Sequence, residues 1–177
     1  MGDLLYAITE WLRSTQLVEL SLWISNTPLS LAIQTHFWAI PTIQTIHIMA
    51  LAGLFGSAFM MNLRILGLSG ASSTVPQTVK RYVPWIWWCL LVLLMTGFLL
   101  MVGEPVRELI NPVFWIKMVL VVVAALLNLL FQARVRRNAP SWDTASGHIA
   151  IRFAAVALIL LWWAIMVAGR WIAYAPV

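Results

Sequence analysis

The sequence has little cysteine, little charge and few acidic residues. Its one cysteine, Cys89, excludes an intrachain disulfide, and no CxxC or CxxCH pattern indicates a redox thiol pair or a c-type haem attachment. Charged residues make up only 10% of the 177 residues. Neither a Walker loop nor a dinucleotide fingerprint occurs. No paired carboxylates, nucleophile with base, or complete metal set falls in one expected layer, so an enzyme is the least favoured class.

Apolar residues dominate what is present. They make up 62% of the chain, more than a soluble domain of this length can bury, because small folds leave much of their area facing solvent. The formal net charge is +5, but the Lys and Arg residues are scattered in short loops between apolar runs. This distribution is typical of membrane topology and not of a nucleic-acid-binding face. Lipid is therefore the expected environment.

Four stretches reach the roughly 20 apolar residues that a helix needs to span a bilayer. They cover residues 42–66, 83–102, 112–131 and 149–171. We expect an all-α integral membrane four-helix bundle over residues 42–177. Residues 1–41 are expected to form one or two interfacial amphipathic helices that precede it on the outer side.

Orientation follows from the positions of the basic residues, which accumulate in cytoplasmic loops. The loops after the first and third spans hold most of them, whereas five of the six acidic residues fall on the opposite side. The pattern predicts a bacterial inner-membrane protein with both termini in the periplasm. The basic residues of the two loops are Arg64, Lys80, Arg81, Arg134, Arg136 and Arg137.

The first residues do not resemble a cleaved signal peptide, because Asp3 and Glu10 interrupt them. Asn26 or Thr27 is an expected helix cap, with Pro28 at the first helical position. A helix continuing from there to residue 66 would be much longer than the bilayer is thick, so Pro41 is expected to mark a kink or break. The apolar positions of the first helix follow helical spacing, and they are Leu4, Leu5, Ile8, Trp11 and Leu12.

Polar residues inside a span are costly, so each is a functional hypothesis. His47 and Lys117 each lie five residues from the outer end of a span, Arg170 lies near the outer end of the fourth span, and Met101 is expected in nearly the same layer. Small residues, including Gly53 and Ser57, fall on one side of His47, where they would admit a flat ligand or a neighbouring helix.

This combination suits haem b, because a neutral imidazole binds iron and basic groups at the membrane edge neutralise the propionates. His47 would be the metal ligand, and Met101 or Met95 is a weak candidate for the sixth position. Each of these residues also has an interpretation without a cofactor. A lone histidine in a span often hydrogen-bonds between helices, Lys117 and Arg170 can extend to lipid phosphates, and small residues often serve helix packing.

Several runs, spread over all four spans, carry a resemblance. They are WAIPTIQTIHIMALAGLFGSAFMMNLRILGL, VPW, NPVFWIKM, LLN, SWD at 141–143 and GRWIAY. Over about residues 26–175 the chain resembles an uncharacterised family of small bacterial inner-membrane proteins with a domain of unknown function. The resemblance implies a four-helix fold without an assigned activity, and it implies that the positions of His47, Arg64, Lys117 and Arg170 recur. Asn62 stands where that pattern usually has Asp, Arg81-Tyr82 stands where His often precedes Pro-Trp, and residues 1–25 look like an addition.

Three functions remain open. The first is a membrane subunit with a haem b or quinone site in the outer leaflet, which transfers electrons to or from a periplasmic partner. The second is a cofactor-free accessory or scaffold subunit of a larger membrane complex. The third is a small copper carrier or transporter that uses His47, Met95 and Met101 as ligands. In every case the expected partners are membrane lipid and other membrane or periplasmic subunits, not nucleic acid.

Overall fold

The computed structural model describes residues 2–68, 73–137, 149–172 and 174, and the regular elements in these ranges are α-helices. In chain order they are α1 (Gly2–Arg13), α2 (Leu17–Ser25), α3 (Pro28–Thr35), α4 (Ala39–Ile65), α5 (Val75–Gly103), α6 (Pro105–Leu109), α7 (Pro112–Arg137) and α8 (Ile149–Trp171). The Ser-Trp-Asp run at 141–143, which contributes to the resemblance, lies outside the described residues. The expected all-α fold class is confirmed.

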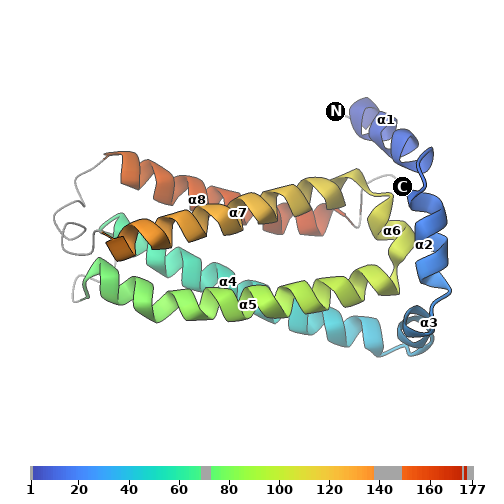
Figure 1. Ribbon diagram of the computed structural model, residues 1–177, viewed down its shortest axis with the longest axis horizontal. Helices are drawn as coiled ribbons and strands as arrows, with labels where there is room; N and C mark the ends of the chain where they lie inside the picture. Colours follow the sequence, from blue (N-terminus) through green and yellow to red (C-terminus); the bar gives the residue numbers. More distant parts are fainter. Residues whose placement is uncertain (1, 69–72, 138–148, 173, 175–177) are drawn as a thin grey trace. The chain divides into compact units, whose positions relative to one another are not determined.

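Helices α4, α5, α7 and α8 are long and apolar enough to cross a membrane (Figure 1). Only 17–22% of the most apolar window of each helix is buried inside the protein, so most of these side chains face outward. Apolar surface of this extent is stable in lipid and not in water. The chain is therefore a multi-pass membrane protein.

Two of these helices are longer than their apolar spans. Helix α5 begins at Val75 and not at the expected residue 83, because Thr74 and Gln77 form a reciprocal cap there. The Gln77 amide nitrogen donates to Thr74 Oγ1 over 3.4 Å, and the Thr74 amide nitrogen donates to Gln77 Oε1 over 3.0 Å. Helix α7 likewise continues past residue 131 to Arg137.

The segment before α4 is helical in three short pieces. Thr27 caps α3 by accepting the Ser30 amide over 3.4 Å, with Pro28 at the first helical position, which confirms the expected start. The helical structure is interrupted at residues 36–38, and this interruption lies before Pro41 and not at it. Pro41 lies in the first turn of α4, where a missing N–H costs no helical hydrogen bond, so the helix tolerates it.

The apolar face expected for helix α1 is only partly buried against the rest of the protein. Leu12 is buried, but Leu4 and Trp11 are exposed, and the small polar residue Thr9 is buried instead. The Thr9 hydroxyl donates to the Leu5 carbonyl over 2.9 Å, which satisfies it without water. The exposed apolar side chains of α1 are therefore available to lipid or to another protein.

The chain divides into two compact units. The first unit comprises residues 1–49, 92–119 and 166–177. Within it α2 lies beside α6 (Figure 1). Its apolar core centres on Ile33, Ala39 and Val102, with Ile24, Ile40, Ile43, Leu99 and Met101 packed against them.

Close backbone approach and a buried hydrogen bond join α3 to α5 in this unit. A Cβ added to Gly103 would lie 2.9 Å from Ile33 Cγ2, so any larger residue would force Ile33 or the backbone to shift. Ser30 is fully buried, and its hydroxyl donates to the Val102 carbonyl over 2.7 Å. This bond satisfies one of the carbonyls that the end of α5 leaves without a helical partner.

The second unit comprises residues 50–91 and 120–165. Its buried positions recur every three or four residues on each helix, which is the spacing of one helical face. They include Leu54, Ala58, Met61, Asn62, Ile65, Val75, Val79, Ile86, Ala124, Asn128, Ala155, Leu158, Trp162 and Ile165. Gly53 allows close packing of α4 on α5, because a Cβ there would lie 3.0 Å from Cys89 Sγ.

Candidate functional site

His47 is held by one specific hydrogen bond. Its Nδ1 atom lies 2.8 Å from Thr96 Oγ1, which joins α4 to α5 in the first unit. The Thr96 hydroxyl has one proton, and that proton is donated to the Val92 carbonyl over 2.7 Å. With that proton on the Val92 carbonyl, Thr96 Oγ1 accepts from His47, and the imidazole then carries its own proton on Nδ1. The Nε2 atom keeps its lone pair and can accept a hydrogen bond or bind a metal.

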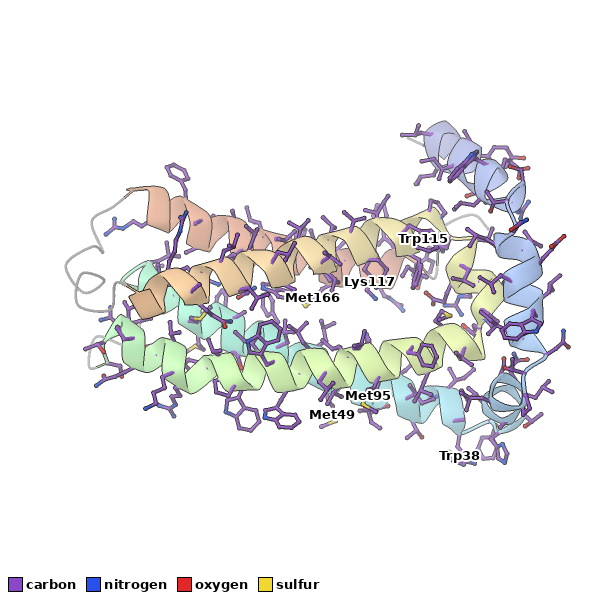
Figure 2. All side chains as sticks on the ribbon, in the orientation of Figure 1. Trp38, Met49, Met95, Trp115, Lys117 and Met166 are labelled. Atoms are coloured by element: carbon purple, nitrogen blue, oxygen red, sulfur yellow. The ribbon has the colours of Figure 1, made fainter. Side chains whose placement is uncertain are left out.

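Lys117 is the basic group that acts on this imidazole. Figure 2 shows its side chain projecting from α7 toward the interior of the first unit. The Lys117 ammonium interacts electrostatically with His47 and with the Glu108 carboxylate. An ammonium and an imidazole are thus both half-buried in the first unit.

Glycines from two other helices flank these side chains. A Cβ on Gly97 of α5 would lie 3.5 Å from His47 Cε1, and a Cβ on Gly169 of α8 would lie 3.4 Å from Lys117 Nζ. The small residues beside the basic groups therefore come from facing helices. Gly53 and Ser57, which were expected to line this site from α4 itself, belong to the second unit.

Glu108 completes the group of charged side chains. It lies on α6, half-buried, and burial raises the pKa of its carboxyl. The positive charges of Lys117 and Arg107 oppose this rise, while the carboxylate of Glu104 adds to it. Arg107 is also paired with Glu104, the residue just before this short helix, at 2.5 Å.

Asn111 fixes the positions from which Lys117 and Gly169 project. This fully buried side chain accepts the Val113 amide over 3.0 Å and so caps the start of α7. Its Nδ2 atom donates to the carbonyl of Ile172 over 2.9 Å. One amide therefore ties the first turn of α7 to the end of α8.

Arg170 is placed differently from His47 and Lys117. It is exposed, and its guanidinium donates to the Tyr174 hydroxyl over 2.9 Å. The same guanidinium lies 5.2 Å from the centroid of the Tyr174 ring. Arg170 thus engages a residue one helical turn away at the surface, and no contact between it and the imidazole is observed.

The methionines expected as ligands lie away from the imidazole. Met101 packs against the apolar cluster around Ile33. Met95 is 61% exposed, and Figure 2 shows it and Met49 projecting away from the interior of the first unit. No group of three or more His, Cys, Asp or Glu side chains suited to a metal is found in residues 2–68, 73–137, 149–172 and 174.

Four residues of this site were not predicted from the sequence, namely Thr96, Gly97, Glu108 and Gly169. Thr96 carried one signal, since it is a polar residue inside an apolar span. The glycines carried none, because glycine is common in spans and only the packing shows which ones face a polar side chain.

The arrangement brings together a lone pair on His47 Nε2, an ammonium and a carboxylate in a half-buried part of a membrane protein. This set can bind a metal through nitrogen, neutralise an acidic group, or donate to and accept from a polar head group.

The chain matches the model of a known protein family. A model of a family described as a family of unknown function matches residues 30–175. Helices α1 and α2 lie before the matched region. No curated protein and no solved structure matches the chain.

Proposed function

The chain belongs to this family of unknown function, DUF6644, and we propose from the geometry at His47 that it is an electron-transfer subunit that binds haem b in the outer leaflet of the bacterial inner membrane. The observation that supports this most is the Nδ1 hydrogen bond to Thr96, which leaves His47 Nε2 free to bind iron. A ligating histidine in proteins usually donates its other ring proton in this way.

The residues around His47 fit haem b through the space beside two glycines and through a positive charge, but they offer a single histidine ligand within the described ranges. Gly97 and Gly169 leave space beside the two basic side chains that a Cβ would fill. Lys117 supplies a positive charge for a propionate. In contrast, the other histidine of the described ranges, His36, is exposed and contacts the Ala32 carbonyl at 2.7 Å through its Nδ1. We therefore expect His47 to be the one histidine ligand from these ranges.

Bound haem would supply a one-electron couple, while the protein fixes its orientation and electrostatics. Thr96 holds the imidazole in the tautomer that can bind iron. Lys117 and the exposed Arg170 offer positive charge close to the periplasmic surface, where a partner that exchanges electrons would dock. Both termini would face the same side.

Absorption spectroscopy tests this proposal directly. Protein extracted gently from its native membrane, or titrated with haemin, is expected to show a Soret band with haem b α and β bands after reduction. His47→Ala should lose these bands, whereas His36→Ala, which changes an exposed histidine, should keep them. Wild-type protein that takes up no haem would overturn the proposal. If partner subunits are still retained, a cofactor-free accessory subunit would be favoured.

A quinone site is the second candidate, and the charged neighbours of His47 favour it. The Lys117 ammonium can donate to a quinone carbonyl, and His47 Nε2 can accept from a quinol hydroxyl. Glu108, half-buried beside Lys117, is suited to hold a proton there. None of these interactions requires iron.

Measurement of bound quinone separates the two candidates. Mass spectrometry of solvent extracts should find quinone at near-stoichiometric amounts, and Lys117→Met should reduce it at least several-fold. Lys80→Met, which removes a lysine from the first turns of α5, serves as the control. Equal quinone in both variants would contradict the quinone proposal and leave the haem proposal untouched.

A further inference from the structure

The core of the second unit contains polar side-chain atoms that are fully covered but have no protein hydrogen-bond partner. They are Asn62 Oδ1, Asn128 Oδ1, Gln132 Nε2 and Trp162 Nε1. Asn62 and Asn128 are each 1% exposed, and Trp162 is 2% exposed. Burying such groups unsatisfied is costly, most of all within a membrane, where solvent cannot compensate.

The orientation of both asparagine amides is fixed by their other hydrogen bond. Asn62 Nδ2 donates to the Ala58 carbonyl over 2.8 Å, and Asn128 Nδ2 donates to the Ala124 carbonyl over 2.9 Å. Exchanging the oxygen and nitrogen of either amide would place two acceptors against each other. The unpaired atom of each asparagine is therefore an acceptor.

The other two atoms are donors for equally firm reasons. Gln132 Oε1 accepts the indole proton of Trp87 over 3.2 Å, so the remaining amide atom of Gln132 is its N–H group. The Nε1 atom of Trp162 can only donate. The core thus presents two acceptors and two donors.

These atoms come from three helices of the second unit. Asn62 continues the buried face of α4 after Leu54 and Ala58, and Trp162 lies on the buried face of α8. Asn128 and Gln132 are four residues apart on α7, so their side chains lie one above the other on one face. All four atoms are covered, and their residues belong to a single unit.

We propose that the core of the second unit is an internal hydration site, in which ordered water bridges α4, α7 and α8 through these four side chains. Water both donates and accepts two hydrogen bonds, which matches two acceptors and two donors, and buried water typically makes about three such bonds. A cation would leave the N–H groups of Gln132 and Trp162 pointing at positive charge. An anion would face the two asparagine oxygens, and an apolar ligand would satisfy none of the four atoms.

This site is independent of the one at His47, since its residues belong to the other unit. Water there would link three membrane-spanning helices without an ionised group. It would also explain how two asparagines and an indole N–H are accommodated in apolar helices.

A structure of the detergent- or nanodisc-embedded protein, at a resolution that shows water, tests the site first. We expect density within hydrogen-bond distance of Asn128 Oδ1 or Asn62 Oδ1, and also of Trp162 Nε1 or Gln132 Nε2. A dry core with direct side-chain pairs would overturn the proposal. A melting temperature that rises with Na⁺ or K⁺, compared with choline at equal ionic strength, would overturn it in favour of a cation.

A stability cycle gives a second readout. Trp162→Phe removes the N–H group and keeps most of the ring, and we expect a fall in Tm of roughly 2–4 °C. Trp163→Phe is the matched control, because Trp163 is exposed, and it should leave Tm nearly unchanged. The double variant Asn128→Leu/Trp162→Phe should lose less than the sum of the single variants, because they share bridging water. Additive losses would contradict the proposal.

Discussion

The Nδ1 atom of His47 lies 2.8 Å from the hydroxyl oxygen of Thr96, and this hydrogen bond engages one of the two nitrogens of the imidazole. The bond joins two membrane-spanning helices, and it is the reason that Nε2 can act as a ligand or acceptor. Thr96 is therefore a positioning residue in both functions proposed above. A substitution that removes its hydroxyl but keeps its shape tests the hydrogen bond to His47 apart from the packing of the side chain.

Thr96→Val keeps the shape of the side chain and removes the acceptor for His47. We expect haem affinity to fall by roughly 10- to 100-fold, the usual cost of losing the hydrogen bond behind a metal-binding histidine. The measurement is a haemin titration followed at the Soret band. Thr45→Val is the control, because the exposed Thr45 bonds only its own helix, at the Pro41 carbonyl. Identical affinities in both variants would show that Thr96 does not position the imidazole.

Glu108 should make stability depend on pH. Because burial raises the pKa of its carboxyl, the folded protein binds this proton more tightly than the unfolded chain does. The free energy of unfolding should therefore fall as pH rises from the ordinary range of a glutamate through the raised value. Glu108→Gln should flatten this slope, measured by thermal unfolding across pH. Glu19→Gln, at an exposed residue of α2, should preserve it, and a slope unchanged by Glu108→Gln would refute the assignment.

Gly103→Ala should loosen the packing of α3 on α5. The added Cβ would lie 2.9 Å from Ile33 Cγ2, which belongs to a stiff β-branched side chain, so we expect a loss of about 1–3 kcal/mol. Gly56→Ala is the matched control, because a Cβ there meets nothing within 4 Å. Thermal unfolding of both variants in one detergent checks the difference. Equal stabilities would mean that α3 does not pack against α5 as described.

Two substitutions of Asn111 should separate its role as the cap of α7 from its hydrogen bond to the Ile172 carbonyl. Asn111→Ala removes both the cap of α7 and the bond to the Ile172 carbonyl, and we expect a loss of about 1–3 kcal/mol. Asn111→Asp keeps an acceptor for the Val113 amide but lacks the donor to Ile172. Proteolysis near the C-terminus should therefore increase in both variants, while thermal stability should fall further in Asn111→Ala. Unchanged proteolysis in both would argue against the link to α8.

The expected break at Pro41 shows where reasoning from the sequence was limited. Helix length required an interruption before α4, and this requirement was correct. A proline interrupts a helix only when it lies past the first turn, however, and the chain stops at residues 36–38, which puts Pro41 inside that turn. The position of a break thus depends on where the next helix starts, which a local pattern does not fix.

For the charged residues, the sequence predicts depth in the membrane but not the direction in which each side chain points. Spacing along the spans predicts His47, Lys117 and Arg170 at one depth, and in the structure the charge of Lys117 acts on His47. Arg170 instead lies at the surface with Tyr174. Depth follows from counting residues, but the direction of a side chain around the helix axis depends on packing against neighbouring helices.

The amino-acid sequence alone determined that the fold class is all-α, that four helices are long and apolar enough to cross a membrane, and that a helix begins at Pro28 after a cap at Asn26 or Thr27. Each of these depends on neighbouring residues, through apolar length or hydrogen bonds of one turn. Only the tertiary structure decided that Thr96 supports His47, that Gly97 and Gly169 flank the basic groups, and that α5 leaves space for Ile33. These relationships join residues far apart in the chain, and they exist only after the helices have packed.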